Sequence, residues 1–114
     1  MMNQDQFDFF FADTCGQKVK IKFSSLAFVE SAGNYVLLTG CNFRTMVYSS
    51  MNRMMDLLED RRFIRIHKSY TVSIDHIEAI KGNECMMDLS GKKVGLPIGV
   101  TYKKEVFKRL GIDR

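Results

Sequence analysis

The sequence predicts a mainly β fold, with eight to ten short strands and two short helices in one domain. Three observations lead to this prediction. Runs of five or six residues rich in β-branched and aromatic side chains recur along the chain. Clusters of Gly, Asn and Ser separate these runs at close intervals, as turns do. The apolar spacing of a helix occurs in two segments.

The chain has 114 residues, the size of one small domain, and 46% of them are hydrophobic, which suits a packed core. No run approaches 18 consecutive apolar residues, so no membrane-spanning helix is predicted. The N-terminus lacks a basic region ahead of an apolar stretch, so we predict no secretory signal and a cytoplasmic location. We interpret the three scattered cysteines as core thiols rather than metal ligands or nucleophiles: Cys15, Cys41 and Cys85.

Residues 7–11 form an aromatic run, and residues 13–16 are typical of a turn. Residues 18–23 then alternate between lysine and apolar side chains, as in a half-buried antiparallel strand. Together the two runs predict a β-hairpin. One face of this hairpin carries Lys18, Lys20 and Lys22. These lysines are either a solvated surface, which we favour, or a row of phosphate contacts.

Three more strands are predicted over residues 26–30, 35–39 and 43–48, since each is a short run rich in apolar residues. Residues 31–34 and 40–42 separate these strands. Both separating segments contain Gly and Asn, which readily adopt the unusual backbone angles of tight turns.

Over residues 51–58 the apolar residues recur at the spacing of a helix rather than that of a strand. Ser49 or Ser50 can cap the start of this helix, and residues 59–62 end it. The apolar side chains on one side of this helix form a stripe that either belongs to the core or lines a groove for a partner, and we favour the core. It consists of Met51, Met54, Met55 and Leu58.

Residues 63–72 (FIRIHKSYTV) predict one strand, because β-branched and aromatic residues dominate them. Residues 67–69 interrupt its apolar face with three hydrogen-bonding side chains in a row, and no acidic residue occurs from 61 to 74. Such an interruption is typical of a functional site, but also of an exposed strand end or a solvated turn.

Residues 76–80, 84–89 and 94–98 predict three further strands, separated by turn-forming residues. Pro97 has no backbone N–H to donate. It therefore places the last strand at the edge of a sheet, or ends that strand.

A closing helix is predicted over residues 102–110, where apolar side chains share one side. Thr101 can cap its start, and Gly111 ends it. The rest of its surface is mostly basic, through Lys103, Lys104, Lys108 and Arg109.

The net charge of +4 and the pI of about 9.1 indicate a polyanionic partner. The sequence contains neither a Walker-type loop nor a dinucleotide-binding glycine motif. His67 and His76 lack the neighbouring Cys or carboxylate spacing of a zinc site. We therefore predict no cofactor, no metal and no enzymatic activity.

Three motifs resemble the LytTR DNA-binding domain of bacterial transcription regulators. Residues 63–72 are similar to its most distinctive block, Phe-x-Arg-x-His-(Arg/Lys/Asn)-Ser-Tyr-x-Val. Residues 28–36 (FVESAGNYV) and 96–104, with their Leu-Pro-Ile-Gly and Tyr-Lys-Lys, resemble its early and closing motifs. The resemblance assigns residues 7–111 to such a domain, with tails at 1–6 and 112–114.

This resemblance implies an elongated arrangement of small antiparallel β-sheets, about ten strands in all, whose loops enter successive major grooves. It places base contacts at Asn34, Lys68 and Val100. By side-chain chemistry, Asn34 suits an adenine edge, and Lys68 suits either guanine O6 and N7 or, slightly off register, a phosphate. The family usually has a basic residue where Val100 stands, and valine can offer only an apolar contact, for example to a thymine methyl group.

Further positions are expected to contact phosphates or to support the loops. His67 either contacts DNA or holds the loop of Lys68, and we favour the supporting role, which we also assign to Tyr70. The expected phosphate contacts are Gly33, Arg65, Ser69, Thr101, Lys103 and Lys104.

The resemblance implies sequence-specific binding of double-stranded DNA, as the output domain of a response regulator in a two-component system. Tandem or paired half-sites, a homodimer on DNA, and a receiver or sensor domain outside this chain are expected with it. The alternative is a protein-interaction module whose basic surface meets an acidic partner, with weak or non-specific nucleic-acid binding.

Overall fold

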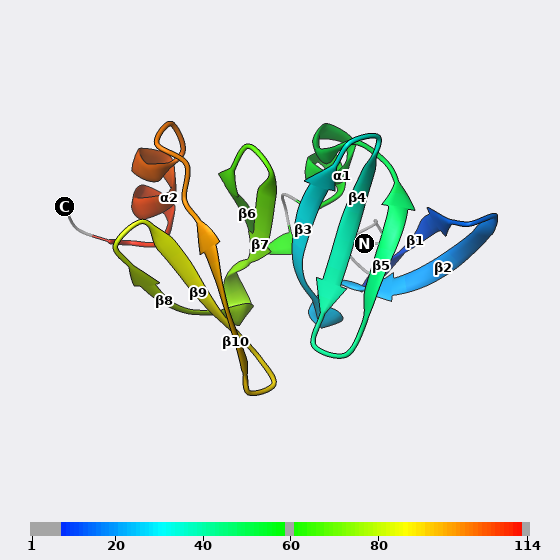
Figure 1. Ribbon diagram of the computed structural model, residues 1–114, viewed down its shortest axis with the longest axis horizontal. Helices are drawn as coiled ribbons and strands as arrows, with labels where there is room; N and C mark the ends of the chain where they lie inside the picture. Colours follow the sequence, from blue (N-terminus) through cyan, green and yellow to red (C-terminus); the bar gives the residue numbers. More distant parts are fainter. Residues whose placement is uncertain (1–7, 59–60, 113–114) are drawn as a thin grey trace, which may run out of the picture.

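The computed structural model describes residues 8–58 and 61–112, and within these ranges it confirms the mainly β fold. Ten described strands form three antiparallel sheets, accompanied by two short α-helices. The sheets follow one another along the longest axis of a molecule that measures 44 × 35 × 28 Å (Figure 1). The predicted tail at 1–6, Phe7, the helix-ending residues 59–60 and residues 113–114 lie outside the described residues.

The first sheet is the predicted hairpin of β1 (Phe9–Thr14) and β2 (Gln17–Lys22). Phe10 and Ile21 face the core, whereas the three lysines of β2 are exposed, as a solvated face requires. A short 3-10 helix, η2 (Phe23–Ser25), leads into the second sheet.

The second sheet has five strands and forms the centre of the molecule, with β3 in its middle. Its order is β5 (Arg44–Tyr48), β4 (Tyr35–Gly40), β3 (Leu26–Ala32), β7 (Tyr70–Ser73) and β6 (Phe63–His67). Both faces are largely buried over β3, β6 and β7, whereas one face of β4 and β5 is partly exposed, as Met46 and Tyr48 show. One face packs on β1, β2 and α1, through residues that include Val29 and Leu38. The other packs on the third sheet and α2, through residues that include Phe28 and Ile66.

The prediction of one continuous strand over residues 63–72 is wrong, because the chain reverses at Lys68 and Ser69. His67 pairs with Tyr70 across this two-residue turn, which joins β6 to β7. The turn contains no Gly, Asn or Asp, so it lacks the usual signal of a short hairpin. The solvated-turn interpretation of residues 67–69 therefore describes the backbone correctly.

Helix α1 (Met51–Leu58) has the predicted bounds. The backbone N–H of Arg53 donates to Ser50 Oγ over 3.1 Å, which identifies Ser50 as the residue that caps the helix. Met51, Met54 and Leu58 are buried, and Met55 packs against them. This confirms the favoured interpretation of the stripe as core.

The third sheet contains β8 (Ile77–Lys81), β9 (Glu84–Leu89) and β10 (Lys92–Pro97), preceded by the 3-10 helix η4 (Ile74–His76). Pro97 ends the edge strand β10, as predicted. Helix α2 (Lys103–Arg109) follows, but its N-cap is Tyr102 and has no side-chain capping bond, so the predicted Thr101 cap is wrong. Gly111 ends the helix as predicted, with a φ of +73° that favours glycine.

The cysteines divide into two environments. Cys85 is buried in β9, and burial raises its pKa to about 11. Cys15 and Cys41 are exposed, so the prediction of core thiols is wrong for both. Both lie in hairpin turns, where their side chains are directed to solvent.

No helix among the described residues has both the length and the apolar content that crossing a bilayer requires.

Cysteine reactivity tests this arrangement. In the folded protein at about pH 8, Ellman's reagent should titrate Cys15 and Cys41 quickly and Cys85 only after unfolding, because a buried, protonated thiol is a poor nucleophile. Cys85→Ala should leave the fast amplitude unchanged. Rapid reaction of all three thiols in the folded state would contradict the burial of β9.

Candidate nucleic-acid interface

Three connections lie side by side along one edge of the molecule, the upper edge in Figure 1. They are the β3–β4 turn, the β6–β7 turn and the segment between β10 and α2. The N–H of Ser31 donates to the carbonyl of Ser69 over 2.9 Å, and the N–H of Gly99 donates to the carbonyl of Ile66 over 2.8 Å. These bonds tie the first and third connections to the hairpin between them. We call residues 33–34, 68–69 and 99–102 the three-loop edge.

The β3–β4 turn presents Asn34 to solvent. Ala32 pairs with Tyr35 across it, and Gly33 has a φ of +70°, which an L side chain rarely adopts. Glycine therefore allows the reversal in two residues, which leaves Asn34 exposed. The Asn34 side chain makes no hydrogen bond to any residue in the described ranges, so its amide is available to a partner.

The β6–β7 turn presents Lys68 and is held by side chains around it. Arg65 Nη2 donates to the carbonyl of Lys68 over 2.6 Å, and Arg65 Nε donates to that of His67 over 3.4 Å. The N–H of Ser69 donates to His67 Nδ1 over 3.0 Å. Nδ1 therefore carries no proton in this arrangement, and His67 makes the contact that a supporting role needs.

The third connection approaches the second closely at Gly99. A Cβ at this position would lie 3.1 Å from Tyr102 Cδ1, which is a tight contact, and 3.5 Å from His67 Cδ2, which is an ordinary one. Beyond Gly99, Val100 is 92% exposed, which is unusual for a valine in a folded domain. Thr101 is exposed beside it.

The charges along this edge are positive. Lys68, Lys103 and Lys104 are exposed, and Lys103 Nζ donates to Asn83 Oδ1 over 2.8 Å. Within the described ranges, the ammonium group of Lys68 has no hydrogen-bond or ion-pair partner. The edge therefore presents a cation that its own fold does not neutralise.

Tyr70 lies across the same turn from His67. It lies opposite Glu30 in the pairing of β7 with β3, and its ring centroid is 5.5 Å from that of His67. Burial, followed by the negative charge of Glu30, raises the pKa of Tyr70 above its ordinary value. The phenol therefore keeps its proton at neutral pH and remains a donor.

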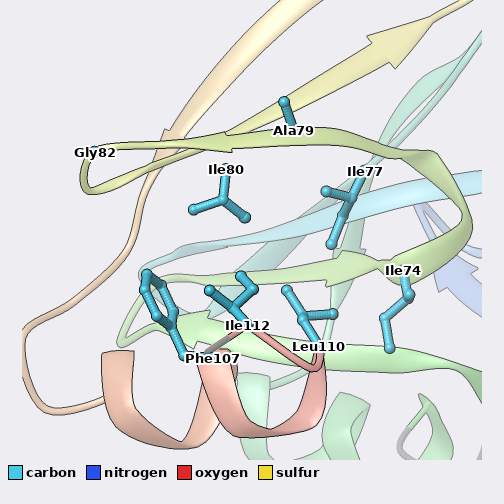
Figure 2. Close-up of a pocket in the computed structure, with 8 residues that line it drawn as sticks. All are labelled: Ile74, Ile77, Ala79, Ile80, Gly82, Phe107, Leu110 and Ile112. Atoms are coloured by element: carbon cyan, nitrogen blue, oxygen red, sulfur yellow. The ribbon is translucent and has the colours of Figure 1, made fainter. Parts of the chain in front are cut away.

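A separate groove of about 600 Å³ opens between β8 and α2 (Figure 2). Its lining is apolar and offers no acid, base or nucleophile: Ile74, Ile77, Ala79, Ile80, Gly82, Phe107, Leu110 and Ile112. In the part of the chain that the structure describes, no three metal-binding side chains gather at one point. This groove therefore supplies no side chain that could carry acid–base or nucleophilic chemistry.

The structure brings the sequence-predicted positions together and adds one that the sequence does not indicate. Arg65, predicted to contact phosphate, uses at least three of its five N–H groups inside the protein, two of them on the turn. The third bond is to Asn52 of α1, over 3.2 Å. No local sequence pattern indicates Asn52, because its partner lies thirteen residues away along the chain.

Two comparisons found similar proteins. The sequence model of the LytTr DNA-binding domain family matches residues 16–111. A solved structure of a LytTr DNA-binding domain, from a methyl-accepting/DNA response regulator of Bacillus cereus, superposes with a TM-score of 0.73. It is 21% identical in sequence, and the alignment covers 92% of this chain and 98% of that one. A search of curated proteins found no significant match.

The role of His67 can be tested without any ligand. His67→Ala removes the acceptor of the Ser69 N–H, so exchange of that amide should accelerate and the free energy of unfolding should fall by about 1 kcal/mol. Amide hydrogen exchange and urea denaturation measure the two effects. His76→Ala is the control, because His76 Nδ1 lies 3.1 Å from Ser73 Oγ, away from the turn. Unchanged Ser69 exchange in His67→Ala would refute the supporting contact.

Proposed function

Because the chain belongs to the LytTR family of DNA-binding domains, we propose that it binds double-stranded DNA in a sequence-specific manner through the three-loop edge. The observation that carries this proposal is the alignment of three connections on one edge, with exposed tips and an unpaired lysine. In this proposal the loops of this edge enter successive major grooves of the duplex.

Each loop has a base contact suited to its chemistry. Asn34 pairs its amide oxygen and nitrogen with the edge of an adenine, and Lys68 donates to O6 and N7 of a guanine. Val100 packs on the methyl group of a thymine. An exposed valine lacks a hydrogen-bond donor, so this third contact discriminates less strongly than the other two.

Phosphate contacts fix the protein on the duplex without reading its sequence. Lys103 and Lys104 supply positive charge at the start of α2, and the Ser69 and Thr101 hydroxyls and the Gly33 N–H supply donors. Arg65 adds charge and N–H groups beyond those used on the turn, while His67 and Tyr70 hold the loop. No metal or cofactor takes part in this recognition.

The chain acts in this proposal as the output domain of a bacterial transcription regulator. The Bacillus cereus structure comes from a response regulator, which is the kind of protein in which a receiver or sensor domain would control such an output. Two copies on tandem or paired half-sites would increase both affinity and selectivity.

A protein-interaction module is the second candidate, and the exposure of Val100 favours it, since exposed apolar side chains mark many interfaces. Analytical ultracentrifugation with and without DNA separates the two. A tight complex with a protein partner that requires Lys103 and Lys104 but not Lys68 would support this candidate.

Selection of bound duplexes from a random pool, followed by affinity measurement at two salt concentrations, tests the proposal. Binding should weaken steeply with salt, because neutralised phosphates release counterions. Lys68→Ala should reduce affinity for the selected site by about 1–3 kcal/mol and relax the preference at one or two positions.

The matched control is Lys92→Ala, which removes an exposed lysine from the β9–β10 hairpin at the opposite edge (Figure 1). Its effect should be small and independent of DNA sequence. Salt-independent binding, no binding at low salt, or equal effects of the two lysine variants would contradict the proposal.

A further inference from the structure

The turn that carries Lys68 lacks the features that stabilise a two-residue hairpin by itself. The favoured turns of this length need a positive φ in at least one of their two residues, and neither Lys68 nor Ser69 has one. The pairing of β6 with β7 is also irregular between Arg65 and His67. The position of Lys68 therefore depends on contacts from outside the turn.

Arg65 provides the strongest of these contacts, since its guanidinium bonds the carbonyls of His67 and Lys68. A guanidinium at the end of a flexible side chain can impose a geometry only if it is itself held. Asn52 Oδ1 accepts a hydrogen bond from Arg65 Nη1 over 3.2 Å. The ring of Tyr102 lies 5.8 Å from Arg65 Cζ, within the range of a cation–π contact.

Asn52 is in turn fixed, because α1 is anchored to the same hairpin at a second point. Thr71 is fully buried, and its Oγ1 lies 3.3 Å from Met51 Sδ and 3.2 Å from Met55 Sδ. Thr71 is also the cross-strand partner of Arg65. The helix therefore meets the hairpin on either side of Asn52, which fixes the backbone position from which the Asn52 side chain reaches Arg65.

We propose that Asn52 is a positioning residue for base readout by Lys68, and that it acts through Arg65. This inference rests on the proposed function. Asn52 contacts neither base nor phosphate in this scheme. It accepts a hydrogen bond from the Arg65 guanidinium, which in turn donates to the carbonyl of Lys68. A neutral amide suits the role, because an aspartate would bind Arg65 and also cancel its charge beside the DNA backbone.

The test uses Asn52→Ala in the whole chain, with Asn42→Ala as the matched control. Both asparagines are exposed, but Asn42 lies in the β4–β5 turn at the opposite edge. Asn52→Asp keeps an acceptor for Arg65. Because Asn52 is exposed, all three variants are expected to fold, and circular dichroism verifies this.

The first readout needs no DNA. Backbone ¹⁵N relaxation should show greater mobility at Lys68 and Ser69 in Asn52→Ala, but not in Asn42→Ala, and Asn52→Asp should restore the order of the turn. Unchanged mobility at the turn in Asn52→Ala would overturn the inference, whatever the DNA measurements show.

The second readout is selectivity on DNA. Asn52→Ala should bind the selected site about five- to ten-fold more weakly, the size expected from the net loss of one typical hydrogen bond. The loss should be accompanied by relaxed preference at the positions that Lys68→Ala affects, with non-specific affinity and the salt slope unchanged. A uniform loss on all sequences would overturn the positioning role.

A double-mutant cycle isolates the route through Arg65. Arg65→Lys keeps the charge but loses the planar guanidinium group that bonds both Asn52 and the turn. Its effect on selectivity should therefore not add to that of Asn52→Ala. Fully additive effects of the two substitutions would show that Asn52 does not act through Arg65. If wild-type protein selects no sequence, the proposed function fails and the inference with it; the relaxation data then distinguish this result from a failure of the Asn52 contact.

Discussion

The hydrogen bonds around the β6–β7 turn are the constraint on which the candidate interface depends. They hold two hairpin turns and the segment between β10 and α2 to one another. The bond from Ser31 to Ser69 joins the turn to β3, and the bond from Gly99 to Ile66 joins its hairpin to the segment before α2. Arg65 and His67 then fix the backbone that carries Lys68. Because these contacts are mainly to backbone groups, they set loop positions rather than side-chain rotamers.

The five-stranded sheet makes this arrangement possible, because its strands β3, β6 and β7 pack against a core on each face. Packed interiors have low compressibility, so a sheet held between two cores is a firm base for its turns. The β1–β2 hairpin and α1 cover one face, and the third sheet and α2 cover the other. Helix α1 contributes twice, since Met51 packs into a core while Asn52 reaches the edge. Stability and the geometry of recognition thus share the same elements.

Strict alternation and helical spacing predicted most of the fold, because burial of one face imposes those periods on the sequence. The bounds of α1 and the edge position of Pro97 followed from local chemistry in the same way. The reversal at Lys68 could not be predicted like this, because side chains distant in sequence stabilise it. The resemblance supplied the candidate base contacts. Spacing alone could not show that Asn34 and Val100 lie on either side of one hairpin, since long-range strand pairing decides this.

The most direct test of a single reading edge is a chemical-shift map of the amide groups during titration with a selected duplex. The account predicts shifts at all three segments of the three-loop edge, residues 33–34, 68–69 and 99–102, at one common affinity. The turns at residues 41–42 and 90–91, on the opposite edge, should stay unperturbed. Shifts centred on those turns or on the apolar groove, or different affinities for the three segments, would contradict it.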